Sequence, residues 1–198
     1  LILPKDVLRK RRGWSKHWNF GLRQEWLDEY IRDPERWDET SALGPKQIMA
    51  LKTWVKTAGL EDSEGNRGFL FCMFRELGVY DPYPWMFLWV NVVFNFATAE
   101  WYVYRVSSGT WTTSMLSNAL FSDIGYVSQR TARDAIMELV GLLQRTPIGG
   151  ELGQGTVDTR THPRLISRKG MSSLPTDVVR HCLESLFRRE RRNRIEFS

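Results

Sequence analysis

Cysteine and histidine are scarce in this chain, and neither residue is arranged as a metal site or a redox motif. The 198 residues contain two cysteines, Cys72 and Cys182, which form no closely spaced pair. The three histidines, His17, His162 and His181, stand far apart without metal-ligand spacing. The composition excludes a disulfide scaffold, and we expect both thiols to be free in a reducing, cytoplasmic environment.

Long apolar runs are also missing. The longest run, from Trp85 to Ala99, is shorter than the roughly 20 residues that a membrane-spanning helix needs, and Asn91 and Asn95 interrupt it. We therefore expect a buried helix here and no contact with a membrane. The glycine-rich segment GGELGQG lacks the spacing and the Lys-Ser/Thr pair of a nucleotide-binding loop.

Signals for hydrolytic chemistry are weak. No acidic residue is followed two positions later by lysine. The acidic-x-Lys part of one common nuclease active site is therefore absent. Carboxylates are concentrated between residues 28 and 39, but there they border an amphipathic pattern, and we interpret them as a solvated helix face. A nuclease would need two or three carboxylates around Mg²⁺ or Mn²⁺. The sequence identifies no catalytic residue and no metal ligand.

What the chain does have is a globular composition with basic ends. Apolar residues make up 42% and charged residues 26%, as in an ordinary folded domain that can bury a core. Residues 1–23 hold seven basic side chains and one acidic one, and residues 160–198 hold ten basic and four acidic ones, so the middle is net acidic. This distribution favours a polyanionic partner reached through the ends. The alternative is that the basic runs are solvated tails.

Hydrophobic periodicity and capping residues predict the elements of the first half. We expect helices over 22–32, 46–58 and 69–77, a hairpin over 60–69, and a long aromatic helix over 85–104. Asp33-Pro34 ends the first helix, Gly44-Pro45 begins the second, and Gly59 follows the last turn of the second.

The second half repeats this order of elements. Thr112 or Thr113 caps a helix through Phe121, and Ser128 caps a longer helix over 129–144. The glycine-rich segment 148–157 is expected to hold two short strands, and a last helix is expected from Pro175 to about Arg191.

A helix-turn-helix pair followed by a hairpin is the arrangement of a winged helix. We therefore predict a mainly α fold with small β-wings, in which two winged-helix-like units are joined by the long aromatic helix. The predicted divisions are a basic lead-in and first unit over 1–83, a linking helix over 84–106, and a second unit with a basic C-terminal helix over 107–198.

The exposed face of the longer helix in each unit is the candidate DNA-binding surface. In a helix-turn-helix the second helix enters the major groove, where Arg and Gln side chains read bases or bind phosphates. The candidates in the second unit are Gln129, Arg130 and Arg133 on the helix and Arg164, Arg168 and Lys169 after the glycine-rich segment. Those in the first unit are Lys46, Gln47, Lys52 and Lys56. The alternative is an ordinary solvated face, with Arg130 and Asp134 as an i,i+4 ion pair.

Several short motifs resemble a bacterial domain family that occurs in DNA phosphorothioation (sulfur modification) operons. They are LGPKQIMALKTW at 43–54, AGL at 58–60, RELGVYDPY at 75–83, the tryptophan-rich segment that follows, and TARD at 131–134. The resemblance spans roughly residues 14–155.

This resemblance implies a subunit similar to the one associated with DNA nicking in single-strand phosphorothioation systems. It implies double-stranded DNA as a partner, together with a cysteine desulfurase, an ATPase and an ATP-pyrophosphatase, and Mg²⁺ or Mn²⁺ as a cofactor if the protein nicks DNA. The family supplies no catalytic motif that can be placed on this sequence residue by residue.

Two other functions are consistent with the predicted fold. A winged-helix transcriptional regulator would prefer one operator and would cut no strand. A protein-interaction module would dock a sulfur-transfer or ATPase partner and bind DNA weakly. A homodimer is compatible with each of these functions.

Overall fold

Local sequence signals set the ends of several helices, as the capping residues predict. In the computed structural model, which describes residues 5–171 and 173–193, Thr112 accepts a hydrogen bond from the amide of Met115 (3.0 Å). Ser128 accepts one from the amide of Thr131 (3.0 Å). Each hydroxyl satisfies an amide that the first turn of a helix leaves without a partner. Gly125 then ends the earlier of these two helices in the left-handed conformation (φ 77°).

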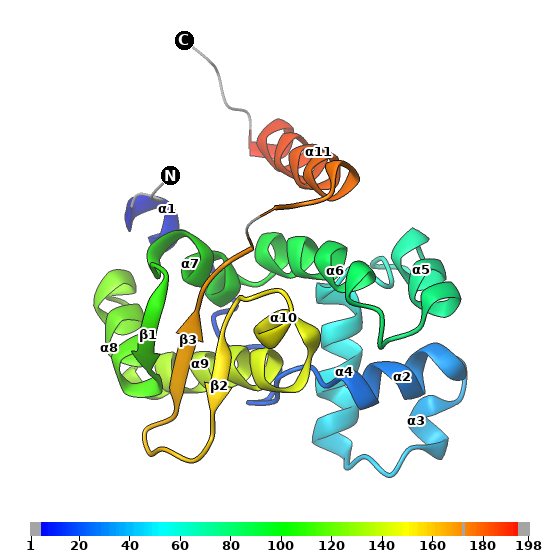
Figure 1. Cartoon of the computed structure of the whole chain (residues 1–198), viewed down its shortest axis with the longest axis horizontal. Coiled ribbons are helices and arrows are strands. Elements are labelled where there is room, and N and C mark those ends of the chain that lie inside the picture. Colours follow the sequence, from blue (N-terminus) through cyan, green and yellow to red (C-terminus); the bar gives the residue numbers. More distant parts are fainter. Residues whose placement is uncertain (1–4, 172, 194–198) are drawn as a thin grey trace.

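The described residues form eleven helices and three strands (Figure 1). The helices are α1 (Lys5–Arg9), α2 (Gln24–Arg32), α3 (Trp37–Thr40), α4 (Pro45–Thr57), α5 (Phe69–Leu77), α6 (Pro82–Asn95), α7 (Ala97–Arg105), α8 (Thr113–Ile124), α9 (Gln129–Arg145), α10 (Pro147–Gly150) and α11 (Thr176–Asn193). The strands are β1 (Gly109–Thr112), β2 (Thr156–Asp158) and β3 (Leu165–Arg168). The mainly helical fold is therefore confirmed. No described helix is both long and apolar enough to cross a membrane.

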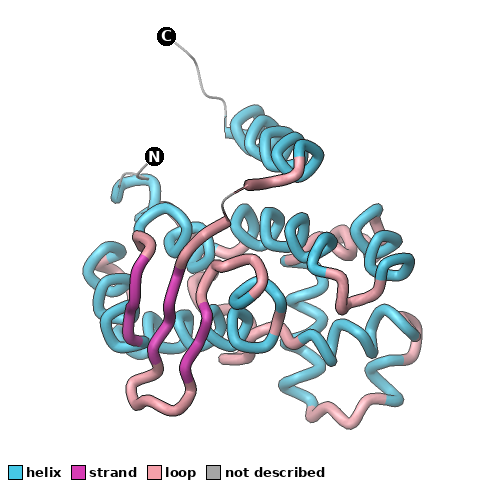
Figure 2. Tube along the Cα trace, in the orientation of Figure 1, coloured by secondary structure: helices cyan, strands magenta, loops and turns pink. Residues whose placement is uncertain are grey.

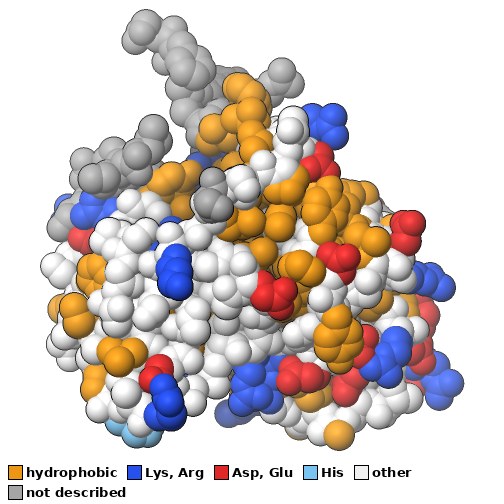
Figure 3. Space-filling model, viewed as in Figure 1, with side chains coloured by type: hydrophobic (Ala, Val, Ile, Leu, Met, Phe, Trp, Pro, Cys, Tyr) orange, Lys and Arg blue, Asp and Glu red, His pale blue; other side chains and the backbone are white. Residues whose placement is uncertain are grey.

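The three strands form one antiparallel sheet in the order β1-β3-β2 (Figure 2). Ile166 of β3 lies opposite Trp111 of β1 and Val157 of β2, and its side chain is fully buried. The sheet lies against α9 and α10 through β2. Its outer side, toward the viewer in Figure 3, is mostly uncharged. The loop of residues 159–164, which joins β2 to β3, projects at the lower left of Figure 1.

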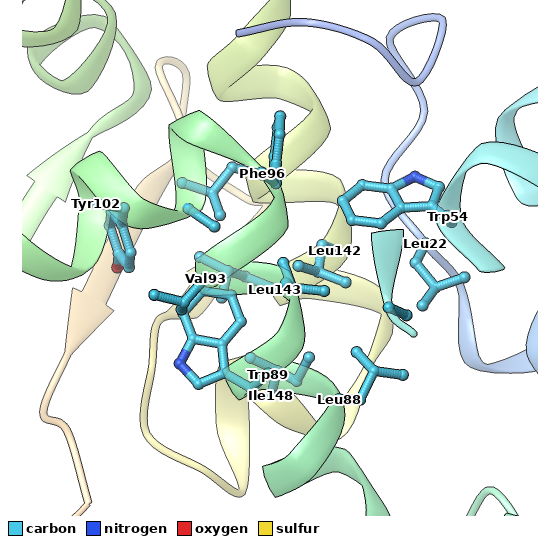
Figure 4. Close-up of a cluster of buried hydrophobic side chains, with 14 of the residues drawn as sticks. Leu22, Trp54, Leu88, Trp89, Val93, Phe96, Tyr102, Leu142, Leu143 and Ile148 are labelled. Carbon is cyan, nitrogen blue, oxygen red and sulfur yellow. The ribbon is translucent and has the colours of Figure 1, made fainter. Parts of the chain in front are cut away.

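Buried apolar side chains from Leu8 to Val178 form one continuous core. Figure 4 shows its centre, where Trp89 of α6, Leu143 of α9 and Ile148 of α10 meet. The three ranges predicted as separate domains all contribute side chains to this core. The predicted division itself stays a prediction.

The predicted long aromatic helix is two helices in the structure. α6 ends at Asn95, α7 begins at Ala97, and Phe96 between them is extended (φ −127°, ψ 108°). The break turns the ring of Phe96 into the core, edge-on to Trp54 with 5.5 Å between ring centroids. The carbonyl of Asn95 accepts from the ammonium group of Lys16 (2.9 Å). Tertiary contacts of Phe96 and Asn95 thus interrupt the helix at this point. The hydrophobic periodicity did not indicate this break.

The first predicted hairpin, over 60–69, is reduced to a single bridge between Glu61 and Arg67. The carboxylate of Asp62 accepts the amide of Asn66 (2.9 Å) and closes a tight local turn. No strand of the described sheet lies next to this turn, so the pairing does not extend.

The second predicted hairpin, over 148–157, was placed in the wrong residues. Pro147 takes the first position of α10, so this segment begins as a short helix. Only Thr156–Asp158 is a strand, and its partner β3 comes after the loop of residues 159–164.

A buried carboxylate joins the N-terminal loop to α9. Glu138 is fully buried and accepts hydrogen bonds from the hydroxyl of Ser15 (2.7 Å) and from the amides of three loop residues. The amide donors are Lys16 (3.2 Å), His17 (3.0 Å) and Asn19 (3.1 Å). Asn19 holds a left-handed conformation (φ 66°), which is uncommon outside glycine. Glu138 therefore fixes the path of a loop that has no regular secondary structure.

His17 carries this connection on to α4. Its Nδ1 lies 3.0 Å from Glu138, its Nε2 lies 3.1 Å from the hydroxyl of Thr57, and its ring stacks on Trp54 at 3.6 Å between centroids. Burial lowers the pKa of His17, although the hydrogen bond and charge of Glu138 oppose this shift. Burial alone would raise the pKa of Glu138, but hydrogen bonds from His17 and Ser15 outweigh it and leave that pKa lowered.

Gly21 allows the same loop to lie directly on α9. A Cβ atom at Gly21 would be 2.1 Å from the backbone nitrogen of Leu142 and 2.6 Å from the Cα atom of Gly141. Both neighbours are backbone atoms that cannot turn aside, so any side chain at Gly21 would push the loop away from α9.

Replacing the buried carboxylate tests this connection. Glu138→Gln should lower the free energy of unfolding at pH 7 by about 3 kcal/mol, because the loop amides lose a charged acceptor in a buried site. The difference from the wild type should shrink as the pH falls below the ordinary glutamate pKa of 4.5. There the unfolded chain takes up a proton that the folded protein, with its lowered pKa, does not. Urea denaturation from neutral to acidic pH measures both effects.

The matched control is Glu151→Gln, because Glu151 is exposed. It should change the free energy of unfolding by less than about 0.5 kcal/mol. Similar losses in the two variants would contradict the role given to Glu138.

Candidate nucleic-acid interface

The first turns of α9 have a buried face and an exposed face, as the periodicity predicts. The buried side chains are Ala132, Ala135 and Ile136, and the exposed ones are Gln129, Arg130 and Arg133. The side chain of Arg130 is 89% exposed, and its Nε lies 3.9 Å from the carboxylate of Asp134. An exposed pair of this kind contributes roughly 0.3–0.5 kcal/mol. The guanidinium group therefore stays available to a ligand.

A hollow of about 350 Å³ lies between this face and α8, and both polar side chains and the apolar Phe121 and Met137 line it. Gln129 and Arg133 line one side of it. The α8 side presents hydroxyl and amide groups, from Thr113, Ser114, Ser117 and Asn118. Such groups bind phosphate and sugar oxygens in protein–DNA complexes, and the N-terminus of a helix also attracts anions. The hollow was not predicted, because its uncharged residues carry no strong sequence signal.

The loop between β2 and β3 carries further basic groups. Arg160 is 88% exposed, and its guanidinium group donates to both carboxylate oxygens of Asp158 (3.0 Å each). This pairing lowers the pKa of Asp158 and balances the two charges. Arg164, at the end of the loop, is half-buried and donates to the side chain of Gln144 at 3.5 Å.

Part of the basic N-terminal run lies beside α8, a placement that sequence reasoning missed. The guanidinium carbon of Arg12 lies 5.1 Å from the ring centroid of Tyr126, in the turn between α8 and α9. Its Nη1 donates to the hydroxyl of Tyr126 (3.2 Å), which also accepts from the indole of Trp14 (2.8 Å). The basic lead-in therefore adds charge to the second half of the chain, not only to the first.

Arg168 has a structural position that the sequence did not predict, and its role as a DNA contact stays a prediction. Its Nη1 donates to the backbone carbonyls of Tyr102 (3.1 Å) and Val106, and its guanidinium carbon lies 4.9 Å from the Tyr102 ring centroid. Burial lowers the pKa of Arg168. The side chain ties β3 to α7, whereas the next residue, Lys169, is exposed.

The candidates of the first half lie on α4, on the right in Figure 1, whereas α8 lies on the left. They are Lys46, Gln47, Lys52 and Lys56. The side chain of Gln47 accepts the amide of Gly44 (2.9 Å) and so caps its own helix. Lys52 pairs with Asp38 (2.6 Å) and lowers the pKa of that carboxyl. The other two lysines are exposed, and no strand of the described sheet follows them as a wing.

No metal centre is evident among residues 5–171 and 173–193, where no three His, Cys, Asp or Glu side chains are grouped to hold an ion. Glu100, which is buried, pairs with Arg11 (2.8 Å) and Arg189 (2.6 Å). Burial raises the pKa of the Cys182 thiol, which disfavours a reactive thiolate.

None of the known protein families, curated proteins or solved structures that were compared with this chain matches it. Its function therefore has to be inferred from its residues and their arrangement.

The structural position of Arg168 can be tested against the exposed Arg160. Arg168→Ala should lower the free energy of unfolding by about 2 kcal/mol, because two backbone carbonyls lose a charged donor. Arg160→Ala should change it by less than about 0.5 kcal/mol, because an exposed ion pair contributes little. Urea denaturation of both variants measures the difference, and the reverse order would show that Arg168 does not hold the sheet.

Proposed function

We propose that this protein binds double-stranded DNA through a winged-helix unit formed by α7, α8, α9 and the β1-β3-β2 sheet. The observation that carries the proposal is the exposed face of α9, where Gln129, Arg130 and Arg133 project opposite the buried face. The order of elements supports it, because the α8–α9 pair is followed by the antiparallel strands β2 and β3. The hollow lies between these two helices, and the projecting loop joins two strands of this sheet.

Each part has a role in this proposal. The N-terminal turns of α9 enter the major groove, where Gln129, Arg130 and Arg133 contact base edges or phosphates. The hydroxyl groups at the start of α8 bind the DNA backbone. The β2–β3 loop, with Arg164, lies along a neighbouring stretch of backbone. Lys169, which follows the opposite end of β3, is a further candidate contact.

The sequence motifs support a biological setting for this DNA-binding unit. We propose that it works in a DNA phosphorothioation system, together with a cysteine desulfurase, an ATPase and an ATP-pyrophosphatase. Strand nicking with Mg²⁺ or Mn²⁺ is the activity that the resemblance implies. It is a separate prediction, since no cluster of side chains that could hold the metal ion is found among the described residues.

Removing the two arginines of α9 tests the proposed DNA contact. Arg130→Ala/Arg133→Ala should weaken binding to a short labelled duplex at least about tenfold near physiological salt. If both side chains contact phosphates, the slope of log affinity against log salt should become shallower by about two, because each contact contributes about 0.9. Fluorescence anisotropy over a salt series measures both quantities.

The matched control is Arg36→Ala/Arg75→Ala, which removes the same charge from two exposed positions away from α9. It should leave affinity within about threefold of the wild type. Equal losses in the two double variants would mean that net charge drives binding. Unchanged affinity in the α9 variant would rule out α9 as the contact.

Supercoiled plasmid tests the nicking prediction. With Mg²⁺ or Mn²⁺ the protein should convert it to open circles, and the α9 double variant should do so more slowly because it binds DNA less tightly. Chelation of the metal is the control. A plasmid that stays supercoiled while it binds the protein would remove nicking from the proposal and leave DNA recognition.

A further inference from the structure

The basic run at residues 9–12, RKRR, is divided in the structure into one inward charge and three exposed ones. Arg11 turns inward, and its Nε lies 2.8 Å from a carboxylate oxygen of the buried Glu100. Arg9, Lys10 and Arg12 are exposed. Within the described part of the chain, none of these three side chains forms an ion pair with a carboxylate. The run therefore presents three positive charges to solvent.

The exposed cations are held beside the α8–α9 pair. Leu8 of α1 is fully buried, and α1 packs against α8. A Cβ atom at Gly125, which ends α8, would lie 3.9 Å from Nη2 of Arg9. Arg12 donates to the hydroxyl of Tyr126 (3.2 Å) in the turn that follows. Both arginines therefore lie against the turn that leads into α9.

This run and the β2–β3 loop lie on opposite sides of α8. In Figure 1, α1 is at the upper left, α8 is at the left and the loop is at the lower left. The exposed side chains of α9 begin directly after the turn that Arg12 contacts, with Gln129 and Arg130. Basic groups therefore flank the proposed recognition helix on both sides, with Arg164 on the side of the loop and residues 9–12 on the other.

We propose that Arg9, Lys10 and Arg12 form a second contact with the backbone of the DNA duplex that α9 binds, on the side away from the β2–β3 loop. This inference rests on the proposed function and extends its interface. Lys and Arg side chains on phosphates position a protein on DNA without reading its sequence. The run therefore adds affinity for every duplex, while α9 supplies the contacts with base edges.

The support beneath the run suits this role. The hydroxyl of Tyr126 accepts from the indole of Trp14 (2.8 Å) as well as from Arg12, so the guanidinium group of Arg12 is already oriented before DNA binds. A side chain that is ordered in the free protein loses less conformational freedom on binding.

Removing two of the exposed charges tests the contact. Neither Arg9 nor Lys10 uses its side chain in a hydrogen bond or ion pair with a described residue, so Arg9→Ala/Lys10→Ala should leave the fold intact. Affinity for a short labelled duplex should fall at least about fivefold near physiological salt. The slope of log affinity against log salt should become shallower by about two, because each phosphate contact contributes about 0.9. Fluorescence anisotropy over a salt series measures both quantities.

The control is Arg36→Ala/Arg75→Ala, which removes the same charge elsewhere and should keep the wild-type slope. Cross-linking then tests the position of the run. In a Cys72→Ser/Cys182→Ala background, a short photoactivatable cross-linker on Lys10→Cys should link to the duplex. The same reagent on the native, exposed Cys72 of a Cys182→Ala chain should not, because α5 lies on the opposite side of the molecule in Figure 1.

The outcomes separate this inference from the proposed function. If the α9 double variant loses affinity but Arg9→Ala/Lys10→Ala does not, the contact of the run is overturned and the proposed function stands. A wild type that binds no duplex would overturn both. Equal cross-linking from residue 10 and from Cys72 would also overturn the inference, because the duplex would then have no fixed position on the chain.

Discussion

The structure depends on one buried carboxylate, Glu138, and on the loop that surrounds it. Burying a carboxylate without partners would cost several kcal/mol of free energy. Glu138 can therefore stay charged in this site only because the loop supplies hydrogen-bond donors. The loop in turn has no regular secondary structure and needs an acceptor for its amides. Each therefore requires the other. Through His17, the same group connects α9 to α4, so that the two halves share one core.

This connection explains how α9 keeps a fixed position in the core while it presents a polar face to solvent. The middle of the helix is fixed by Glu138 and by the close approach of Gly21 to Gly141. Its first turns are then free to carry exposed arginines on one side. The N-terminal end of α9 is held by the cap at Ser128. The turn before it is held by the contact between Arg12 and Tyr126. A rigid helix with a solvated cationic end is what a DNA-reading element needs.

The sequence predicted those parts of the fold that depend on neighbours in the chain. Ser128 and Thr112 cap helices through their own hydroxyl groups, and Gly59 follows α4 in the left-handed conformation. The exposed face of α9 follows from periodicity. It could not predict contacts between distant residues. The acceptor role of Glu138 toward a loop more than a hundred residues earlier leaves no local pattern.

The same limit explains why the sequence did not predict what several candidate residues contact within the fold. Arg168 has the sequence context of a DNA-binding cation, but the packing of β3 turns its guanidinium group onto α7. Lys52 and Gln47 on α4 are likewise engaged by Asp38 and by the helix's own N-terminus. The hollow beside α8 could not be predicted from the sequence, because serine, threonine and asparagine occur on most protein surfaces.

The central claim is that DNA lies on the α8–α9 face, and amide chemical-shift mapping tests it most directly. On addition of a short duplex near physiological salt, the largest shifts should fall in residues 112–118, 128–134 and 159–164, with little change along α4. Shifts concentrated on α4, or none at all at DNA concentrations that saturate a specific DNA-binding domain, would contradict the account.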